Sequence, residues 1–299
     1  MATQQSVGRW VAMLAAVVLL AASGCSSEPV APASIQKAQA PAVATPADGA
    51  VPEWAKVSPL QIDSARKAVV PVAKEIVLGG GITMKLVLIP AGKFTMGEGN
   101  DQHEVTLSKP FYVGVTEVTQ AQYQAVMGTN PSNFKDATNP VEMVSLTDAT
   151  EFCKKLSEKT RQAVRLPTEA EWEYACRAGT ATAYSFGDAD SALGDYAWYG
   201  SNSGNTTHPV GQKKPNAWGL YDMHGNVWEW CADWYGSYPT GAVTDPQGAA
   251  SGTSRVLRGG SWFYNPSDCR SANRNGLTPD FRIINLGLRV VVSVSALGL

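Results

Sequence analysis

The long stretch from residue 181 to residue 287 is the feature that most constrains the fold. No helical or strand-like pattern persists there, and short segments are broken by Gly, Asn, Asp and Pro. Loops longer than about 15 residues are uncommon in compact domains, and those that occur usually carry function or bind ions. The sequence therefore predicts an α+β domain with much irregular structure rather than a helical bundle.

Regular elements are predicted before this stretch. Residues 82–89 read as a strand that ends in a Pro-Ala-Gly turn. Three helices are predicted, at 119–127, 147–156 and 168–178, each beginning at a threonine. The third starts with a capping box, in which Thr168 is followed three residues later by Glu171.

Composition excludes two classes of protein. The chain has 299 residues, of which 44% are hydrophobic and 17% charged, with a net charge of −2. This balance lacks the basic footprint of a nucleic-acid binder, so no nucleic-acid partner is expected. Nine Trp, ten Tyr and seven Phe require a buried core, which excludes disorder for most of the chain.

The N-terminus has the pattern of an export signal. Arg9 precedes an apolar run at 11–22 that is too short for a spanning helix, and small residues then lead to Cys25. This pattern resembles a bacterial lipobox, with Ala22 where Leu is usual, so plain secretion is the alternative. We predict a lipoprotein signal peptide at 1–25, lipidation of Cys25, and a cell-envelope protein anchored to the membrane, periplasmic or surface-facing.

A tether is predicted to follow the signal. Residues 26–74 are rich in Ala and Pro and poor in large apolar side chains, which is typical of an extended linker. A short helix between 58 and 74 would end at Pro71. The folded domain is predicted to occupy 75–299.

Export changes the interpretation of the cysteines. Four remain beyond Cys25, an even set that predicts two disulfides in an oxidising compartment. The spacing leaves three pairings open. The four are Cys153, Cys176, Cys231 and Cys269.

Several segments of the chain share a specific order and spacing. In chain order, the segments are Phe94-Thr95-Met96-Gly97, His103-Glu104-Val105, Glu117-Val118-Thr119, Arg165-Leu166-Pro167-Thr168-Glu169-Ala170-Glu171-Trp172, Gly219-Leu220-Tyr221-Asp222-Met223, Gly225-Asn226-Val227-Trp228-Glu229-Trp230, Arg258-Gly259-Gly260-Ser261-Trp262 and Gly287-Leu288-Arg289. Together they resemble the formylglycine-generating enzyme family, the sulfatase-modifying factors. The resemblance covers about 87–292 and implies a fold similar to a C-type lectin domain.

The resemblance also implies what the site lacks. Oxidases of this family hold Cu(I) with two cysteines that follow the Gly-Gly-Ser segment, because a soft ion needs two thiolates. Here Tyr264 stands where one thiolate is expected and Cys269 falls near the other. Bound copper is therefore not expected. The alternative is an oxidoreductase of the formylglycine-generating type, or a siderophore-maturation oxidase, with an atypical site of Cys269, Tyr264 and Arg274.

A structural calcium ion is implied instead. Four positions match a calcium site of the family through two carboxylates and two peptide carbonyls, and Ca²⁺ favours such oxygen ligands. The alternative is that the first carboxylate caps a turn while the last pairs with an arginine. The four residues are Asp222, Gly225, Val227 and Glu229.

The C-terminal loops are the predicted contact face. Their mixture of aromatic, amide and small polar residues is typical of recognition surfaces. They also resemble the variable region of ligand-binding proteins diversified by retroelements, although a fixed surface is favoured. We therefore predict a non-catalytic accessory protein that binds an unknown protein or small-molecule ligand. The predicted contact residues are Trp262, Tyr264, Asn265, Ser267, Asp268, Asn273, Asn275, Phe281 and Ile283.

Overall fold

The computed structural model describes residues 50–294. The predicted signal peptide, Cys25 and the first part of the predicted tether lie outside these residues. Within 50–294, no helix has the length and apolar character needed to cross a bilayer.

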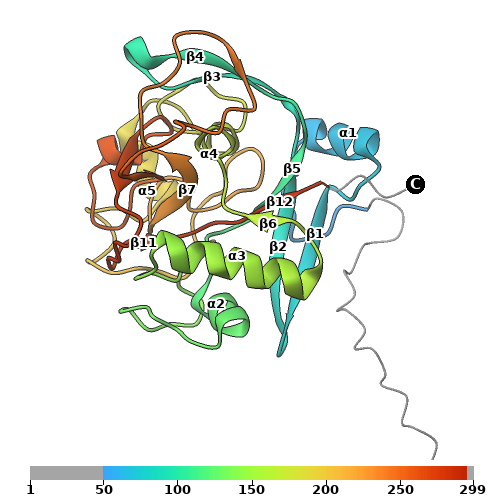
Figure 1. Ribbon diagram of the computed structural model, residues 1–299, viewed down its shortest axis with the longest axis vertical. Coiled ribbons are helices and arrows are strands. Elements are labelled where there is room, and N and C mark those ends of the chain that lie inside the picture. The colour runs from blue at the N-terminus through green and yellow to red at the C-terminus, as the bar shows by residue number, and fades with distance from the viewer. Residues whose placement is uncertain (1–49, 295–299) are drawn as a thin grey trace, which may run out of the picture. The chain divides into compact units, whose positions relative to one another are not determined.

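A five-stranded antiparallel sheet organises the first half of the domain (Figure 1). Its strands, in spatial order, are β1 (Ala73–Gly79), β2 (Ile82–Ile89), β5 (Phe111–Gly114), β12 (Val291–Ser293) and β6 (Val164–Arg165). Val113 of β5 pairs with Val87 on one side and with Val291 on the other. The strand nearest the C-terminus thus lies between two strands from much earlier in the chain. The predicted strand at 82–89 is confirmed as β2.

Capping boxes fix the starts of four helices. Ser58, Thr119, Ser145 and Thr168 each accept a hydrogen bond from the backbone three residues on, which satisfies an otherwise unpaired N–H. The helices are α1 (Pro59–Ala68), α2 (Gln120–Met127), α3 (Leu146–Thr160) and α4 (Glu169–Arg177). The predictions at 119–127 and 168–178 are confirmed. The prediction at 147–156 was too short and misplaced the cap, because Asp148 completes the box at Ser145.

Helix α1 lies within the region predicted to be a tether, so that prediction is wrong for this segment. The side chain of Gln61 is fully buried, and its Nε2 donates to the carbonyls of Leu88 (2.9 Å) and Trp218 (3.1 Å). These bonds join α1 to strand β2 and to a distant loop. The folded region therefore begins before residue 75.

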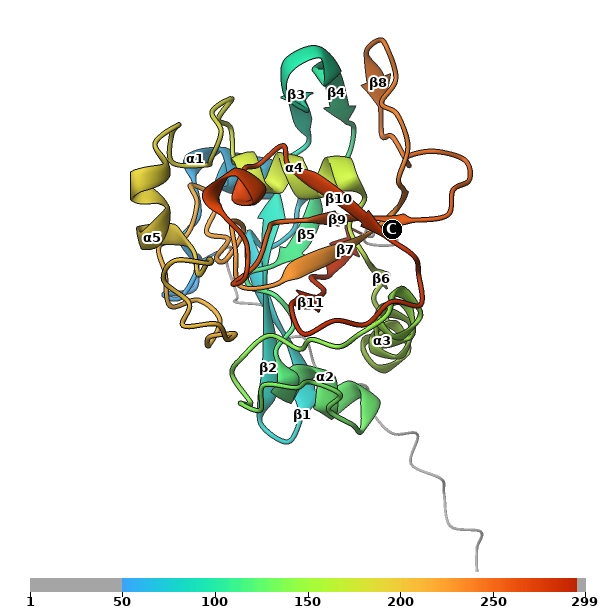
Figure 2. The same cartoon turned by 90° about the vertical axis from the view of Figure 1, so that its left-hand side faces the viewer.

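The second half contains smaller elements joined by long loops (Figure 2). One sheet has the order β10–β9–β7–β11, and another has the order β3–β4–β8. Figure 2 shows β3, β4 and β8 projecting together beyond α4. The remaining bounds are β3 (Gly92–Met96), β4 (His103–Leu107), β7 (Trp228–Trp234), β8 (Val243–Thr244), β9 (Arg255–Arg258), β10 (Arg274–Leu277), β11 (Leu286–Gly287), α5 (Leu193–Tyr196) and the 3-10 turns Gly99–Asp101, Asp190–Ala192 and Pro266–Cys269.

Tryptophans fill the core between these elements. Trp172 of α4 and Trp228 and Trp230 of β7 are among the largest fully buried side chains. They attach α4 to the four-stranded sheet and so position the loops that follow β7 and β9. The α+β fold class with long irregular stretches is confirmed.

Candidate functional site

Trp262, the first predicted contact residue, is buried, and the prediction that it forms part of the surface is wrong. Its indole Nε1 donates to the carbonyl of Ile284 (3.2 Å), and its ring meets Phe134 edge-on, with 5.6 Å between ring centroids. The indole therefore joins two loops. Its role is to support the side chains around it.

Those neighbouring side chains form an apolar surface that we call the aromatic patch. It consists of the exposed Phe263 and Ile284 and the half-buried Phe134, and the buried Trp262 supports it. Phe263 is 63% exposed and contacts the edge of the Trp262 ring, with the centroids 5.6 Å apart. Ile284, whose carbonyl bonds Trp262, is 38% exposed. The sequence analysis missed Phe263, because no periodic pattern in this irregular loop indicates which side chains are exposed.

The other predicted contact residues differ in exposure. Those that the structure leaves exposed are Asn265, Ser267, Asn275 and Phe281. Those that are half-buried are Tyr264, Asp268, Asn273 and Ile283. They belong to the loop after β9, the turn Pro266–Cys269, strand β10 and the loop before β11. Phe281 and Ile283 lie in the same loop as Ile284.

The three residues of the predicted atypical oxidase site are engaged elsewhere. Cys269 is fully buried, and a β-carbon at Gly260 would lie 2.6 Å from its Sγ. Burial raises the pKa of this thiol to about 12. The Tyr264 ring packs edge-on against Trp228, with 5.4 Å between centroids, and Arg274 forms an ion pair with Glu169. Among the described residues, no hydrogen bond joins any two of these three side chains.

The four predicted disulfide cysteines are free, buried thiols in this structure, so the prediction of two disulfides is wrong for it. Each lies on a different element, namely α3, α4, β7 and the turn Pro266–Cys269. Cys176 Sγ lies 3.6 Å from Ser271 Oγ and 3.8 Å from His224 Nε2. Burial raises the pKa of Cys153 and Cys176 to about 12 and that of Cys231 well above its usual value, which keeps these thiols protonated.

Glu229, a predicted calcium ligand, forms a buried ion pair with Arg289. Arg289 Nη2 and Nε lie 2.8 and 3.0 Å from Glu229 Oε1, and Trp172 Nε1 donates to Oε2 at 2.6 Å. The alternative pairing of this carboxylate with an arginine is therefore what the structure contains. Both carboxylate oxygens already accept hydrogen bonds.

Asp222, the first predicted ligand, fits a cation better. Its Oδ2 accepts from the Gly211 N–H at 2.7 Å, while Oδ1 is buried with no hydrogen-bond partner. Burial raises its pKa to about 6, and burial together with Asp222 and Glu229 raises the pKa of Glu117 well above its usual value. Within 50–294, no cluster of three or more His, Cys, Asp or Glu side chains is arranged to hold a metal. A cation here would rest on Asp222 and peptide carbonyls.

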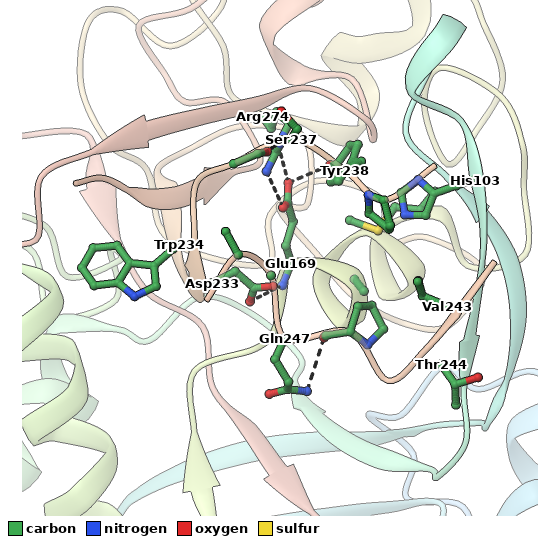
Figure 3. Close-up of a pocket in the computed structure, with 17 residues that line it drawn as sticks. His103, Glu169, Asp233, Trp234, Ser237, Tyr238, Val243, Thr244, Gln247 and Arg274 are labelled. Atoms are coloured by element: carbon green, nitrogen blue, oxygen red, sulfur yellow. Dashed lines mark hydrogen bonds and ion pairs between the residues drawn. The ribbon is translucent and has the colours of Figure 1, made fainter. Parts of the chain in front are cut away.

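A separate cavity of about 460 Å³ opens beside the start of α4 (Figure 3). Strands β3, β4, β8 and β10, the start of α4, the end of β7 and the loops after β7 and β8 contribute its walls. Figure 3 shows Glu169 between Arg274 and Asp233. Arg274 Nη2 and Nε lie 2.7 and 2.8 Å from the two Glu169 oxygens, and the Tyr238 hydroxyl donates to Oε1 at 2.8 Å.

Comparison with known proteins identifies the family. The model of the sulfatase-modifying factor enzyme 1-like domain matches residues 81–294. This chain belongs to that family. The predicted family and its formylglycine-generating-enzyme fold are thereby confirmed.

The proteins that are similar to this chain carry different names. The chaperone protein LppX of Paenibacillus barcinonensis is 33% identical over 264 residues, covering 70% of this chain and 89% of LppX. The formylglycine-generating enzyme of Streptomyces coelicolor is 40% identical over 168 residues, covering 50% of this chain and 52% of the enzyme. The chain thus spans about half the length of the formylglycine-generating enzymes of Streptomyces coelicolor and Mus musculus.

Solved structures share the family fold. Treponema denticola variable protein 1 is 35% identical with a TM-score of 0.72, and the match covers 75% of this chain and all of that one. PvdO from Pseudomonas aeruginosa is 29% identical with a TM-score of 0.63, covering 74% of this chain and 98% of PvdO. The fold is therefore common to proteins with different names, and function must be argued from the site.

Proposed function

We propose that this family member is a non-catalytic accessory protein of the cell envelope that binds a polypeptide partner through the aromatic patch. The observation that carries the proposal is the exposed apolar surface of the aromatic patch in a domain whose Cys269 thiol is not available to bind copper. Cys269 is buried and protonated, and the position expected for a second thiolate holds Tyr264. One buried thiol does not provide the two soft ligands that Cu(I) requires.

The composition of the aromatic patch supports a polypeptide ligand. Phe263 and Ile284 expose apolar side chains on loops held by Trp262, and such patches mark protein interaction sites. Aromatic anchors supply much of the binding energy at protein interfaces. The likeness to LppX, which is named as a chaperone protein, favours the same class of role.

The test is the binding of an unfolded protein by the chain expressed without its first 25 residues. Reduced, carboxymethylated α-lactalbumin serves as the probe, and fluorescence anisotropy measures binding. Replacing Phe263 and Ile284 together by Ser is expected to weaken binding by about tenfold or more, equivalent to about 1.4 kcal/mol.

The matched control replaces two exposed apolar side chains outside the aromatic patch. Val51 and Leu60 are 39% and 53% exposed, and their replacement by Ser is expected to leave binding unchanged. Equal losses in both double variants would show that the interaction is non-specific. Binding that survives in the patch variant would refute the proposal.

The oxidase alternative is tested on the same protein. Cu(I) competition against a chromophoric chelator is expected to give no tight site, and a cysteine-containing sulfatase peptide is expected to keep its mass under oxygen. Stoichiometric copper binding that Cys269→Ser abolishes, with conversion of the peptide cysteine to formylglycine, would instead establish an oxidase.

We further propose that Ca²⁺ binds at Asp222, with the peptide carbonyls of Gly225 and Val227 as additional ligands. The buried, unpartnered Oδ1 of Asp222 supports this proposal, because an uncompensated carboxylate oxygen is costly to bury. Calcium is expected to raise the melting temperature and chelator to lower it. Asp222→Asn should remove this response, whereas Asp101→Asn, at an exposed position, should keep it.

A further inference from the structure

The cavity beside α4 is a distinct site with apolar and aromatic walls. Met96, Val243 and Ala249 line it, and the Tyr238 ring packs against His103 with 4.8 Å between ring centroids. Its volume of about 460 Å³ falls in the range of small-molecule pockets. The aromatic patch contributes no residue to this lining.

Each nitrogen of the arginine in this cavity already donates a hydrogen bond. Arg274 directs Nε and Nη2 at Glu169, and its Nη1 donates to the carbonyl of Gly236 at 2.7 Å. Its guanidinium also lies over the Tyr238 ring, 4.1 Å from the centroid. Because Glu169 already neutralises Arg274 and also lies 3.6 Å from the buried Arg258, an anionic ligand would have to compete with Glu169 for the guanidinium.

Asp233 is the acidic residue of the cavity lining that takes no part in this ion pair. It is 2% exposed, and among the described residues its carboxylate accepts one hydrogen bond, from the Glu169 N–H to Oδ2 at 2.9 Å, and forms no ion pair. Gly248 closes over it, since a β-carbon there would lie 2.8 Å from Oδ1. The positive φ of 73° at Gly248 suits glycine and keeps the loop close.

The surroundings of Asp233 favour its neutral form when the cavity holds no ligand. Burial is the main cause that raises its pKa to about 7, and Glu169 and Glu171 add to the effect while Arg274 opposes it. Arg255 of β9 and Cys231 of β7, the strand that carries Asp233, also interact with this carboxyl. A bound cation would supply the missing opposite charge and favour the ionised form.

We propose that this cavity binds a small organic amine, with its ammonium group on the Asp233 carboxylate and its apolar body against Met96, Val243 and Ala249. Tyr238 and His103 supply the aromatic part of the cavity wall. Among the described residues, Asp233 is the carboxylate of this lining that has no ion-pair partner, whereas Glu169 pairs with Arg274 and Arg258. A monoamine would complement Asp233, whereas a carboxylate or phosphate would not.

The test uses three monoamines of different shape, namely 2-phenylethylamine, cyclohexylmethylamine and 3-methylbutylamine, titrated by calorimetry into the chain without its first 25 residues. At least one is expected to bind. Its neutral analogue, for example 2-phenylethanol in place of 2-phenylethylamine, should bind about tenfold more weakly or worse. Failure of all three amines at low-millimolar concentration would overturn the proposal, as would equal binding of amine and alcohol.

Variants assign the binding to Asp233. Asp233→Asn keeps an oxygen for the Glu169 N–H and is expected to lower affinity by about tenfold or more. Asp101→Asn, at an exposed position, should bind like the wild type. Ala249→Leu fills the apolar wall without touching the charge, and it tests the cavity if Asp233→Asn fails to fold. Unchanged affinity in either cavity variant would contradict the proposed location.

Proton release provides a second readout. Near pH 6 an incoming amine should displace the proton of Asp233, so the measured binding enthalpy should depend on the ionisation enthalpy of the buffer. Above pH 8 the carboxyl is already ionised, and the dependence should disappear. Buffer-independent enthalpies at both pH values would show that Asp233 does not receive the ammonium group.

Discussion

The buried ion pair of Glu229 and Arg289 is the residue-scale contact with the largest expected effect on stability. Both side chains are 1% exposed, and Arg289 also donates to the carbonyls of Gly114 and Tyr221 at 2.9 Å. Arg289→Met leaves an uncompensated carboxylate in the core and is expected to cost about 3–5 kcal/mol. Guanidinium unfolding measures this change.

An exposed pair supplies the control for that variant. Lys93 and Glu104 lie 3.0 Å apart on the β3–β4 hairpin with more than half of each side chain exposed. Lys93→Met is expected to cost less than about 1 kcal/mol, because solvent screens the pair. Similar losses of unfolding free energy in Arg289→Met and Lys93→Met would contradict the conclusion that burial makes the first ion pair the more important one.

Glu142 predicts how stability depends on pH. Its Oε1 accepts from the Phe134 N–H at 2.8 Å, its Oε2 is buried without a partner, and burial raises its pKa to about 7. A raised carboxyl pKa stabilises the fold below the ordinary value of 4.5, and this contribution is lost as the pH rises through 7. The melting temperature of the wild type should therefore fall relative to that of Glu142→Gln between about pH 5 and pH 8. A difference in melting temperature between the two proteins that stays the same from pH 5 to pH 8 would refute this assignment.

Single residues also show why exposure was hard to predict. Trp262 and Phe263 are neighbours in an irregular loop, yet one is buried and the other is 63% exposed. No alternation or helical period separates them, because the direction of each side chain is set by Phe134 and Ile284 from distant segments. The prediction of two disulfides failed for a related reason. The number of cysteines and the predicted compartment do not determine whether two sulfur atoms lie close enough to bond.

At the scale of elements, the docking of α1 predicts a stability effect in a segment first interpreted as a tether. Gln61→Leu removes the donor from the carbonyls of Leu88 and Trp218 and is expected to cost about 1–3 kcal/mol. Leu60→Ala on the exposed side of the same helix should change stability by less than about 0.5 kcal/mol. Urea unfolding compares the two. Equal and small effects would mean that α1 does not contribute to the fold.

Helix starts were the best predicted elements, because a capping box is local in sequence. Thr119 and Thr168 each cap the helix that the sequence placed there. A short helix before Pro71 was considered for this segment, but its place in the folded domain was missed, because the buried Gln61 bonds residues that are remote in the chain. Asp233 lies near the end of β7, a strand that the sequence analysis did not predict, and Tyr238 lies in the irregular loop after it, so the amine cavity could not be predicted.

At the scale of the whole molecule, the predicted lipid anchor determines where the protein resides. Cys25→Ser is expected to abolish incorporation of an alkyne-labelled palmitate and to move the chain from the membrane fraction to the soluble envelope fraction. Cys269→Ser should leave both labelling and fractionation unchanged. Labelling that survives in Cys25→Ser would refute the lipobox prediction.

The position of β12 has a consequence for biogenesis. β12 pairs with both β5 and β6, because Val291 lies opposite Val113 on one side and Arg165 on the other. The sheet is therefore continuous only when β12 is in place. A ribosome makes β5 and β6 well before the strand that joins them. The nascent chain therefore cannot complete this sheet until residue 291 has been made, and a product truncated before residue 291 would expose two unpaired strand edges to aggregation.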